Sequence, residues 1–267
     1  MPHDNRPVGV FDSGLGGLTV VAALKEALPQ EDIIYLGDNA RVPYGNKSPE
    51  NIIRFGLENT EFLLSKGVKA VIVACNTVSA VALAQIRESQ KSLPVLGVLE
   101  AGVGACLAEK PLRAVVIGTR ATINSDAYRR MIHARDAGII VNSVACPLFV
   151  PLAEEGITEG ALVRQVIDHY IGSLLTEPPD LILLGCTHYP LLKSALRDYL
   201  PPSVKIVDSA IACASYAADY LKENGLAASP AKKGEYRYYV TDLAADFFAQ
   251  AGRFLGQRLR HVEKISL

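Results

Sequence analysis

The feature of the sequence that most constrains the fold is a series of short apolar runs, rich in valine and isoleucine, which alternate with segments of helical periodicity. The runs cover residues 8–11, 33–36, 70–74, 95–99, 114–118, 139–145, 181–185 and 204–207. Short, continuously apolar runs are typical of strands in a parallel sheet, where helices cover both faces. The sequence therefore predicts an α/β fold with mainly parallel sheets.

Two pairs of strand ends repeat along the chain. Residues 71–77 and 181–188 each lead from an apolar strand into a cysteine and then into polar residues, and residues 8–14 and 115–122 form a second pair of such junctions. The two cysteines lie 111 positions apart (186 minus 75), and the second pair has a similar offset. Two copies of one α/β unit explain this pattern. Because ligands bind at the carboxyl ends of parallel strands, we expect both cysteines to reach a cleft between the units.

The repeat also suggests domain boundaries. We expect a first α/β domain made of residues 1–98 and 210–267, and a second made of residues 99–209. The tail after Ser209 has helical patterns and one strand-like run at 236–240, which is too little for a third domain. We therefore expect the tail to pack on the first domain.

Composition excludes several classes of protein. The 267 residues are 49% hydrophobic and 21% charged, which is ample for a packed core. The formal net charge is -1, so there is no basic excess for a nucleic acid partner. The apolar stretch 93–108 contains Pro94 and Glu100, so we expect no membrane span. An N-terminus without an apolar signal segment and five scattered cysteines favour a cytoplasmic location over a disulfide-bonded, secreted protein.

A glycine cluster follows the first predicted strand and resembles the loop of a dinucleotide site. Gly14 and Gly16 have the spacing of that motif, but Thr19 occupies its third glycine position. Asp12 stands where a pyrophosphate would approach, and its negative charge would repel that group. Backbone N–H groups beside a carboxylate suit a zwitterion better, because they offer donors to one end and negative charge to the other.

Two of the five cysteines are candidates for chemistry. Cys106 and Cys213 lie within helical patterns and, like Cys146, are most simply interpreted as small buried hydrophobes. Cys75 and Cys186 differ, because each ends an apolar strand and precedes side chains that can donate hydrogen bonds. If a helix begins just after each cysteine, its N-terminal amides are expected to lower the pKa of the thiol toward neutrality.

Few chemistries use two thiols on opposite walls of one pocket. A disulfide would be poorly placed there, and Cys75, Cys186 and His188 give a zinc ion three ligands where it needs four, so we expect no metal. A hydrolase needs a single nucleophilic cysteine. Proton transfer at a stereocentre needs two groups, since a base removes a proton from one face of the carbon while an acid delivers one to the other face. His188, two residues beyond Cys186, is a candidate proton partner.

Six motifs, in order, resemble those of glutamate racemases, within the cofactor-independent aspartate/glutamate racemase superfamily. They are Asp-Ser-Gly-Leu-Gly-Gly-Leu-Thr-Val (12–20), Tyr-Leu-Gly-Asp (35–38), Val-Pro-Tyr-Gly (42–45), Ala-Cys-Asn-Thr-Val-Ser-Ala (74–80), Cys-Pro-Leu-Phe-Val-Pro-Leu-Ala-Glu-Glu-Gly (146–156) and Leu-Gly-Cys-Thr-His-Tyr-Pro-Leu (184–191). The resemblance implies two pseudo-symmetric α/β domains with the active site between them. It also implies a homodimer that interconverts L- and D-glutamate without a cofactor and supplies D-glutamate for bacterial peptidoglycan.

The resemblance assigns catalytic roles to four residues of the motifs. By similarity, Cys75 deprotonates D-glutamate and Cys186 deprotonates L-glutamate. Asp12 matches an acid that assists Cys75, and His188 matches the residue that assists Cys186.

The resemblance also implies further site residues. Those that match binders of the α-amino and α-carboxylate groups are Ser13, Asn76, Thr77 and Thr187, together with Asp12 and His188. Tyr44 and Gly45 match a loop whose backbone amides hold the side-chain carboxylate. A further acidic helper is Glu154 or its neighbour Glu155, of which we favour Glu154. Asp38 has either a role in the site or that of a helix or turn cap.

Three other functions stay open on the sequence alone. An aspartate or hydantoin racemase would share the scaffold and differ in substrate. A cysteine hydrolase would use Cys186 with His188 and would not need Cys75. A non-catalytic module would bind an amino acid without turnover.

Overall fold

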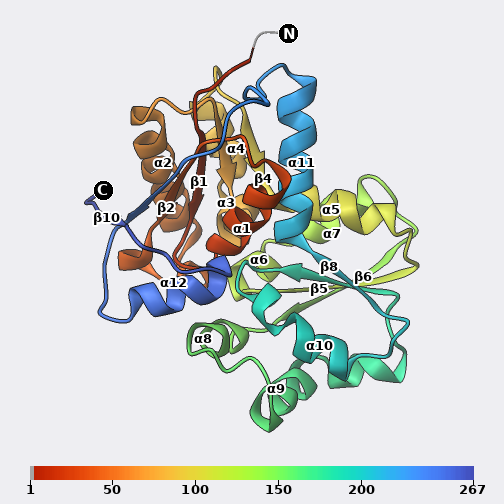
Figure 1. The fold of residues 1–267 in the computed structure, drawn as a ribbon. Coiled ribbons are helices and arrows are strands. Elements are labelled where there is room, and N and C mark those ends of the chain that lie inside the picture. Colours follow the sequence, from red (N-terminus) through yellow and green to blue (C-terminus); the bar gives the residue numbers. More distant parts are fainter. Residues whose placement is uncertain (1–2) are drawn as a thin grey trace.

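The fold consists of two parallel β-sheets flanked by helices (Figure 1). The computed structural model describes residues 3–267. The first sheet has the order β10–β9–β2–β1–β3–β4, with β1 (Val8–Asp12), β2 (Ile33–Gly37), β3 (Ala70–Val73), β4 (Val95–Gly97), β9 (Tyr236–Val240) and β10 (Glu263–Lys264). The second has the order β6–β5–β7–β8, with β5 (Arg113–Gly118), β6 (Ile140–Ala145), β7 (Leu181–Gly185) and β8 (Lys205–Asp208). The strand pairings are parallel, which confirms the predicted fold class.

Each predicted apolar run corresponds to one of the strands β1 to β8, and the run at 236–240 is β9. One run extends more than one residue beyond its strand. The run at 95–99 was predicted to be strand throughout, but β4 ends at Gly97 and helix α5 begins at Val98. The Gly97 N–H donates to the Glu100 carboxylate at 3.4 Å, so a polar contact starts the helix inside an apolar stretch.

Helices connect the strands and cover both faces of each sheet. Those of the first region and the tail are α1 (Leu18–Ala27), α2 (Pro49–Ser65), α3 (Asn76–Val81), α4 (Leu83–Ser89), α11 (Ser209–Glu223) and α12 (Phe247–Leu255). Those of the middle region are α5 (Val98–Ala108), α6 (Arg120–Asn124), α7 (Ala127–His133), α8 (Phe149–Glu154), α9 (Ala161–Ile171) and α10 (Lys193–Tyr199). Short 3-10 turns cover Asn39–Arg41, Tyr44–Asn46, Gly172–Thr176 and Tyr189–Leu192.

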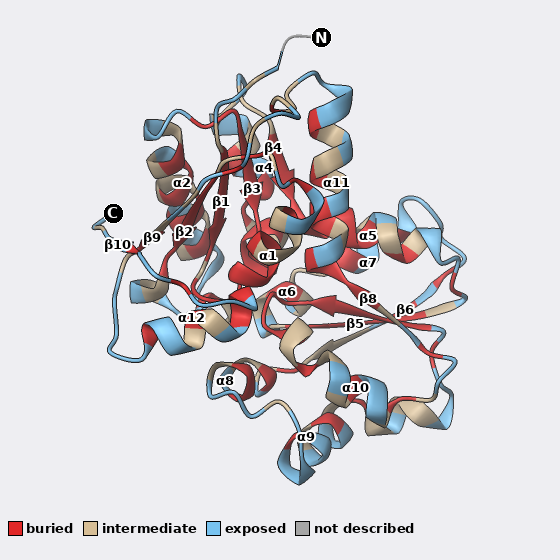
Figure 2. Cartoon of the chain, viewed as in Figure 1, coloured by how far each residue is buried: buried red, intermediate tan, exposed pale blue. Residues whose placement is uncertain are grey.

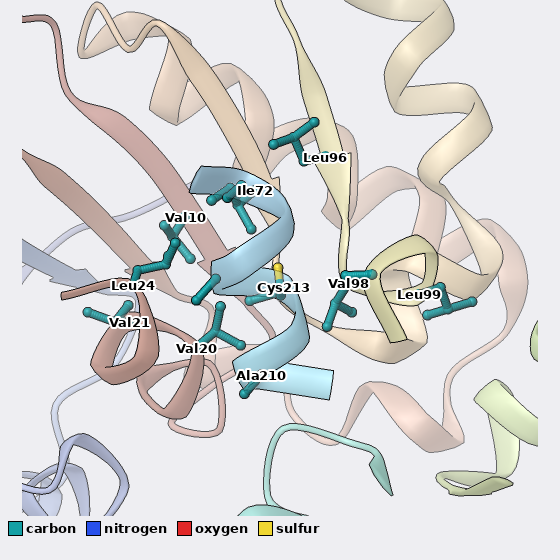
Figure 3. Close-up of a cluster of buried hydrophobic side chains, with 14 of the residues drawn as sticks. Val10, Val20, Val21, Leu24, Ile72, Leu96, Val98, Leu99, Ala210 and Cys213 are labelled. Atoms are coloured by element: carbon teal, nitrogen blue, oxygen red, sulfur yellow. The ribbon is translucent and has the colours of Figure 1, made fainter. Parts of the chain in front are cut away.

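The largest hydrophobic core joins one face of each sheet. It contains Val10 and Ile72 of the first sheet and Val116 and Leu183 of the second, together with residues of α1, α5 and α11. Figure 3 shows α11, which carries Cys213, beside α1 and the start of α5. Alternate side chains of a strand point to opposite faces of the sheet, so the strand residues on either side of these four pack into the cores on the opposite faces. The two sheets therefore share a core, which fixes how their carboxyl ends face one another.

Two smaller cores cover the remaining faces. Helices α2 to α4 pack on the first sheet, and α8 to α10 pack on the second. In Figure 2 the strands are mostly buried, while the outer sides of these helices are exposed. The tail adds β9 and β10 to the edge of the first sheet. We propose that the domains divide after residues 98 and 209, because α5 and α11 begin at these points and pack on each other. Across residues 3–267, the structure contains no helix long and apolar enough to span a membrane.

Candidate active site

The carboxyl ends of the two sheets meet, and hydrogen bonds cross between them. Asp12 is the last residue of β1, and its Oδ1 accepts a bond from the Thr187 hydroxyl, just beyond β7, at 3.4 Å. Asn76 begins α3, and its Oδ1 accepts a bond of 2.6 Å from the Tyr128 hydroxyl of α7. Residues from both halves of the chain therefore meet at the carboxyl ends of the sheets, where the repeated strand ends predicted a shared cleft.

The glycine cluster allows a close approach between the two halves of the chain. A Cβ atom on Gly16 would lie 2.5 Å from His188 Nδ1 and would also overlap the Thr187 hydroxyl. A Cβ atom on Gly17 would overlap Asp12. The space in front of the loop is thus filled by the segment after β7, as expected for close backbone packing rather than for a phosphate site.

Cys75 lies at the N-terminus of α3 with its side chain nearly buried, at 4% exposed. Its thiol lies 3.7 Å from the Ser13 hydroxyl. Burial, and after it the negative charge of Asp12, raise the pKa of the thiol to about 12. The Val78 amide and the Ser13 hydroxyl oppose this rise, while the charge of Cys186 adds to it.

The expectation that the helix start brings the pKa of the Cys75 thiol toward neutrality was wrong. The helix is present, and its Val78 amide does lower the pKa. The effect of that one amide is smaller than the penalty for placing a thiolate in a dry site beside a carboxylate. Cys75 is consequently a protonated thiol at neutral pH.

Asp12 is fully buried and ties together several parts of the site. Its Oδ2 accepts a bond from the Gly14 N–H at 3.1 Å, and its Oδ1 accepts the bond from Thr187. Burial raises the pKa of the carboxyl group, while the positive charge of His188 and nearby backbone N–H groups act in the opposite direction. This carboxylate is placed between the Cys75 side and the Cys186 side of the site.

Cys186 follows β7 and has a charged partner. Its sulfur lies 3.9 Å from His188 Nδ1, and His188 Nε2 lies 3.0 Å from Glu154 Oε1. Burial lowers the pKa of His188, but the contacts with Cys186 and Glu154 outweigh burial and raise it to about 10. His188 is therefore an imidazolium at neutral pH. Glu155 is exposed on the surface, so the contact with His188 singles out Glu154 as the acidic partner.

A buried donor without a partner points to where a ligand would bind. Asn76 Nδ2 is buried, and within residues 3–267 nothing accepts its hydrogen bonds. Beside it, the hydroxyl of Thr77 lies 2.9 Å from that of Thr119 and 3.4 Å from that of Thr122. Thr119 and Thr122 were not among the predicted site residues, and neither was Tyr128. The strand-to-loop junction at 115–122 was the signal that could have indicated the two threonines.

Tyr44 is buried, and its hydroxyl donates to the carboxylate of Asp38. Asp38 also accepts a bond of 2.6 Å from Arg41 Nε. It lies at the N-cap position, just before the 3-10 turn Asn39–Arg41, but its side chain makes no capping bond, so the cap interpretation was wrong. A Cβ atom on Gly45 would lie 2.8 Å from Thr119 Cβ, which places this loop against the second half of the chain.

The remaining cysteines are buried, as the sequence predicted. Cys106 and Cys213 are in hydrophobic cores, and burial raises the pKa of Cys106 to about 11 and of Cys213 to about 12. Cys146 is also buried, and its carbonyl accepts a bond of 2.8 Å from the Tyr189 hydroxyl. Over the part of the chain that the structure describes, no group of three or more His, Cys, Asp or Glu side chains is arranged to hold a metal ion.

Comparisons with known proteins show which family this chain is similar to. The model of the Asp/Glu/Hydantoin racemase family matches residues 16–217. A glutamate racemase of Neisseria meningitidis serogroup B is 44% identical over 263 residues, which cover 98% of this chain and 97% of that protein. The structure of a glutamate racemase from Francisella tularensis, solved with D-glutamate, has a TM-score of 0.92 at 42% identity and covers 98% of both chains. A glutamate racemase isoform from Bacillus anthracis has a TM-score of 0.94 at 37% identity and covers 99% of both.

Proposed function

Since the chain belongs to the Asp/Glu/Hydantoin racemase family, and is thus an amino-acid racemase, we propose that it interconverts L- and D-glutamate with two thiols. One observation carries the two-thiol mechanism. Cys75 and Cys186 follow strands of different sheets whose ends are joined by the Thr187–Asp12 hydrogen bond, both side chains are nearly buried, and each has a different hydrogen-bonding neighbour. The choice of glutamate rests on the similarity to glutamate racemases over almost the whole chain.

The proposed reaction moves one proton in each of two steps. A thiolate on one face takes the α-proton, so the Cα–H bond breaks, an S–H bond forms, and the electron pair passes into the α-carboxylate. The thiol on the other face then delivers its proton to the α-carbon and becomes the thiolate. We propose that Cys186 acts as the base toward L-glutamate and Cys75 toward D-glutamate.

The protonation states favour one starting arrangement. Cys75 is a protonated thiol at neutral pH, because burial and Asp12 raise its pKa to about 12. A protonated Cys75 is the proton donor required when L-glutamate is converted to the D-enantiomer. On the other side, the His188 imidazolium can stabilise negative charge on the Cys186 sulfur, 3.9 Å from its Nδ1. The reverse direction requires deprotonation of Cys75. The ammonium group of a bound substrate would favour it, because a positive charge beside Asp12 offsets the negative charge that raises the pKa of Cys75.

The same site offers donors for the charge that develops on the substrate. The unpartnered Nδ2 of Asn76 and the hydroxyls of Thr77 and Thr187 are proposed to hold the α-carboxylate. Fixed donors in a dry site stabilise an enediolate-like charge better than water does, because they need no reorganisation. The 42–46 loop is proposed to hold the side-chain carboxylate through backbone amides at Tyr44 and Gly45. Ser13 and Asp12 are proposed to contact the substrate near Cys75.

Several wider roles belong to the same proposal. The chemistry is carried by thiols and hydrogen-bond donors, so no cofactor takes part. We propose that the protein acts as a homodimer in the cytoplasm and supplies D-glutamate for peptidoglycan. Support for these roles is the similarity to glutamate racemases over 98% of the chain.

Circular dichroism of pure enzyme with L-glutamate tests the proposal. The signal should decay to zero, and the same experiment in D₂O should place deuterium at the α-carbon of the product. L-aspartate under the same conditions should lose its signal far more slowly. A stable glutamate signal, or faster decay with aspartate, would overturn the choice of substrate.

A further inference from the structure

The end of helix α8 is held by a residue from the C-terminal tail. The last carbonyl groups of a helix lack partners within the helix, and Glu154 is the last residue of α8. Its carbonyl accepts a hydrogen bond of 2.9 Å from Arg253 Nη1, at the end of α12. A positive charge at a helix C-terminus is favourable, because the carbonyl ends there carry partial negative charge. Arg253 therefore fixes the backbone of the residue whose carboxylate contacts His188.

A glycine makes room for this contact. Gly156 follows α8 with a φ of 71°, in the left-handed region, and its N–H donates to the Ala153 carbonyl at 3.1 Å. A Cβ atom on Gly156 would lie 2.9 Å from Arg253 Cζ. The guanidinium thus lies directly against bare backbone, and a side chain at position 156 would displace it.

The next residue of α12 contacts His188 itself. The rings of Phe254 and His188 lie 5.1 Å apart between centroids at an interplanar angle of 78°, an edge-to-face arrangement. Phe254 is 3% exposed, so this aromatic contact is shielded from water. Because the two nitrogens of His188 face Cys186 and Glu154, the orientation of the ring determines both contacts.

We propose that Arg253 and Phe254 are positioning residues for the Cys186 side of the site. Arg253 sets the place of Glu154 through its backbone, and Phe254 sets the orientation of the His188 ring. The hydrogen bond of Arg253 is to Glu154 and the aromatic contact of Phe254 is with His188, whereas the Cys75 thiol contacts Ser13. The inference rests on the proposed function, and it predicts that the loss of either residue weakens proton transfer at Cys186 but not at Cys75.

Rates of racemisation alone cannot separate the two sides. The enantiomers have equal free energy, so the equilibrium constant is one and kcat/KM must be the same in both directions for every variant. Exchange of the α-proton in D₂O can separate them. In a Cys75→Ala background, Cys186 can remove the α-proton of L-glutamate and return a deuteron to the same face. In a Cys186→Ala background, Cys75 can do the same with D-glutamate.

The test adds Arg253→Gln, and separately Phe254→Leu, to each background. We expect each change to slow exchange of L-glutamate in Cys75→Ala about tenfold, since misplacement by about 1 Å can reduce a rate by up to about 10²-fold. Exchange of D-glutamate in Cys186→Ala should stay within about twofold of its parent. Arg253→Lys should recover part of the loss, because it retains a cationic donor for the Glu154 carbonyl.

Matched controls lie close by. Arg258 is an exposed arginine just past α12, and Phe248 is a phenylalanine of α12 that is 40% exposed. Arg258→Gln and Phe248→Leu should leave both exchange rates unchanged. Equal loss of both exchange reactions in Arg253→Gln and Phe254→Leu would mean a general structural role and would overturn the inference, as would no loss in either.

Failure of the proposed function would look different. If the two single-cysteine parents show no preference for one enantiomer, the assignment of thiols to enantiomers is wrong. In that case, racemisation by enzyme that retains both cysteines tests the positioning role of Arg253. Arg253→Gln should lower kcat about tenfold with KM within about twofold, and an unchanged kcat would overturn the inference.

Discussion

The two cysteines occupy matching places in the chain but have different surroundings. Each follows an apolar parallel strand, Cys75 after β3 and Cys186 after β7. Cys75 faces the neutral hydroxyl of Ser13 and the buried carboxylate of Asp12, whereas Cys186 faces the imidazolium of His188. The repeat thus places the two sulfurs at equivalent positions, each after a strand. The neighbouring residues differ, so Cys75 keeps its proton and Cys186 has a cationic partner.

The first and largest test of this comparison removes each sulfur. Cys75→Ala and Cys186→Ala should each reduce racemisation by about 10³-fold or more, because positioned acid–base groups contribute about 10²–10⁴-fold and both are needed. Circular dichroism of L-glutamate measures the loss. Cys213→Ala, in the hydrophobic core, is the control and should retain activity. Near-normal turnover by Cys75→Ala with loss only in Cys186→Ala would favour a single-cysteine mechanism.

The second test concerns a group that both sides share. Asn76→Ala should lower kcat by about 10²-fold, as the loss of one oxyanion donor does in other enzymes. Tyr128→Phe removes the bond to Asn76 Oδ1 but leaves the free Nδ2, so its loss should be much smaller. Steady-state kinetics of both variants measures the difference. If Tyr128→Phe were as impaired as Asn76→Ala, the proposed role of Asn76 Nδ2 as a donor to the substrate would be contradicted.

The third test compares two adjacent carboxylates. Glu154→Gln removes the charge beside His188 and should lower kcat about tenfold, in the range expected for groups that act through another residue. Glu155→Gln, one residue further and exposed, should retain the parent rate. The opposite result would identify Glu155 as the partner of His188.

The smallest expected effect is on stability and comes from the Cys186 side. The pKa of His188 rises from 6.5 to about 10 on folding, so the imidazolium stabilises the native state fully below about pH 6.5. That contribution is lost as the pH rises through about 10. The Tm difference between the parent and His188→Asn should therefore shrink as pH increases from 6.5 to 10. A constant difference would show that His188 is not an imidazolium in the folded protein.

The sequence predicted the parts of the molecule that depend on local pattern. Apolar periodicity predicted the strands, and it erred at 95–99, where Val98 is equally apolar in a strand and in α5. The strand-end position of Cys75 and Cys186 predicted that the ends of the two sheets would meet, as the Thr187–Asp12 bond shows. The pKa of Cys75 could not be predicted, because the burial of its thiol and its closeness to the charge of Asp12 are tertiary effects.

Contacts between segments that are distant in the chain also could not be predicted from the sequence. Arg253 lies 99 residues after Glu154, and no spacing rule links them. The same holds for Tyr128 and Asn76, which meet only because the two sheets share a core. Gly156 was visible in the sequence as part of a motif, but its role in accommodating Arg253 depends on the packing of α12.

The most direct test of the central claim is exchange of the α-proton in D₂O by the two single-cysteine variants, followed by NMR of each enantiomer. Cys75→Ala should exchange L-glutamate alone, and Cys186→Ala should exchange D-glutamate alone. Exchange of both enantiomers by either variant would mean that one thiol reaches both faces of the α-carbon, and it would contradict the account.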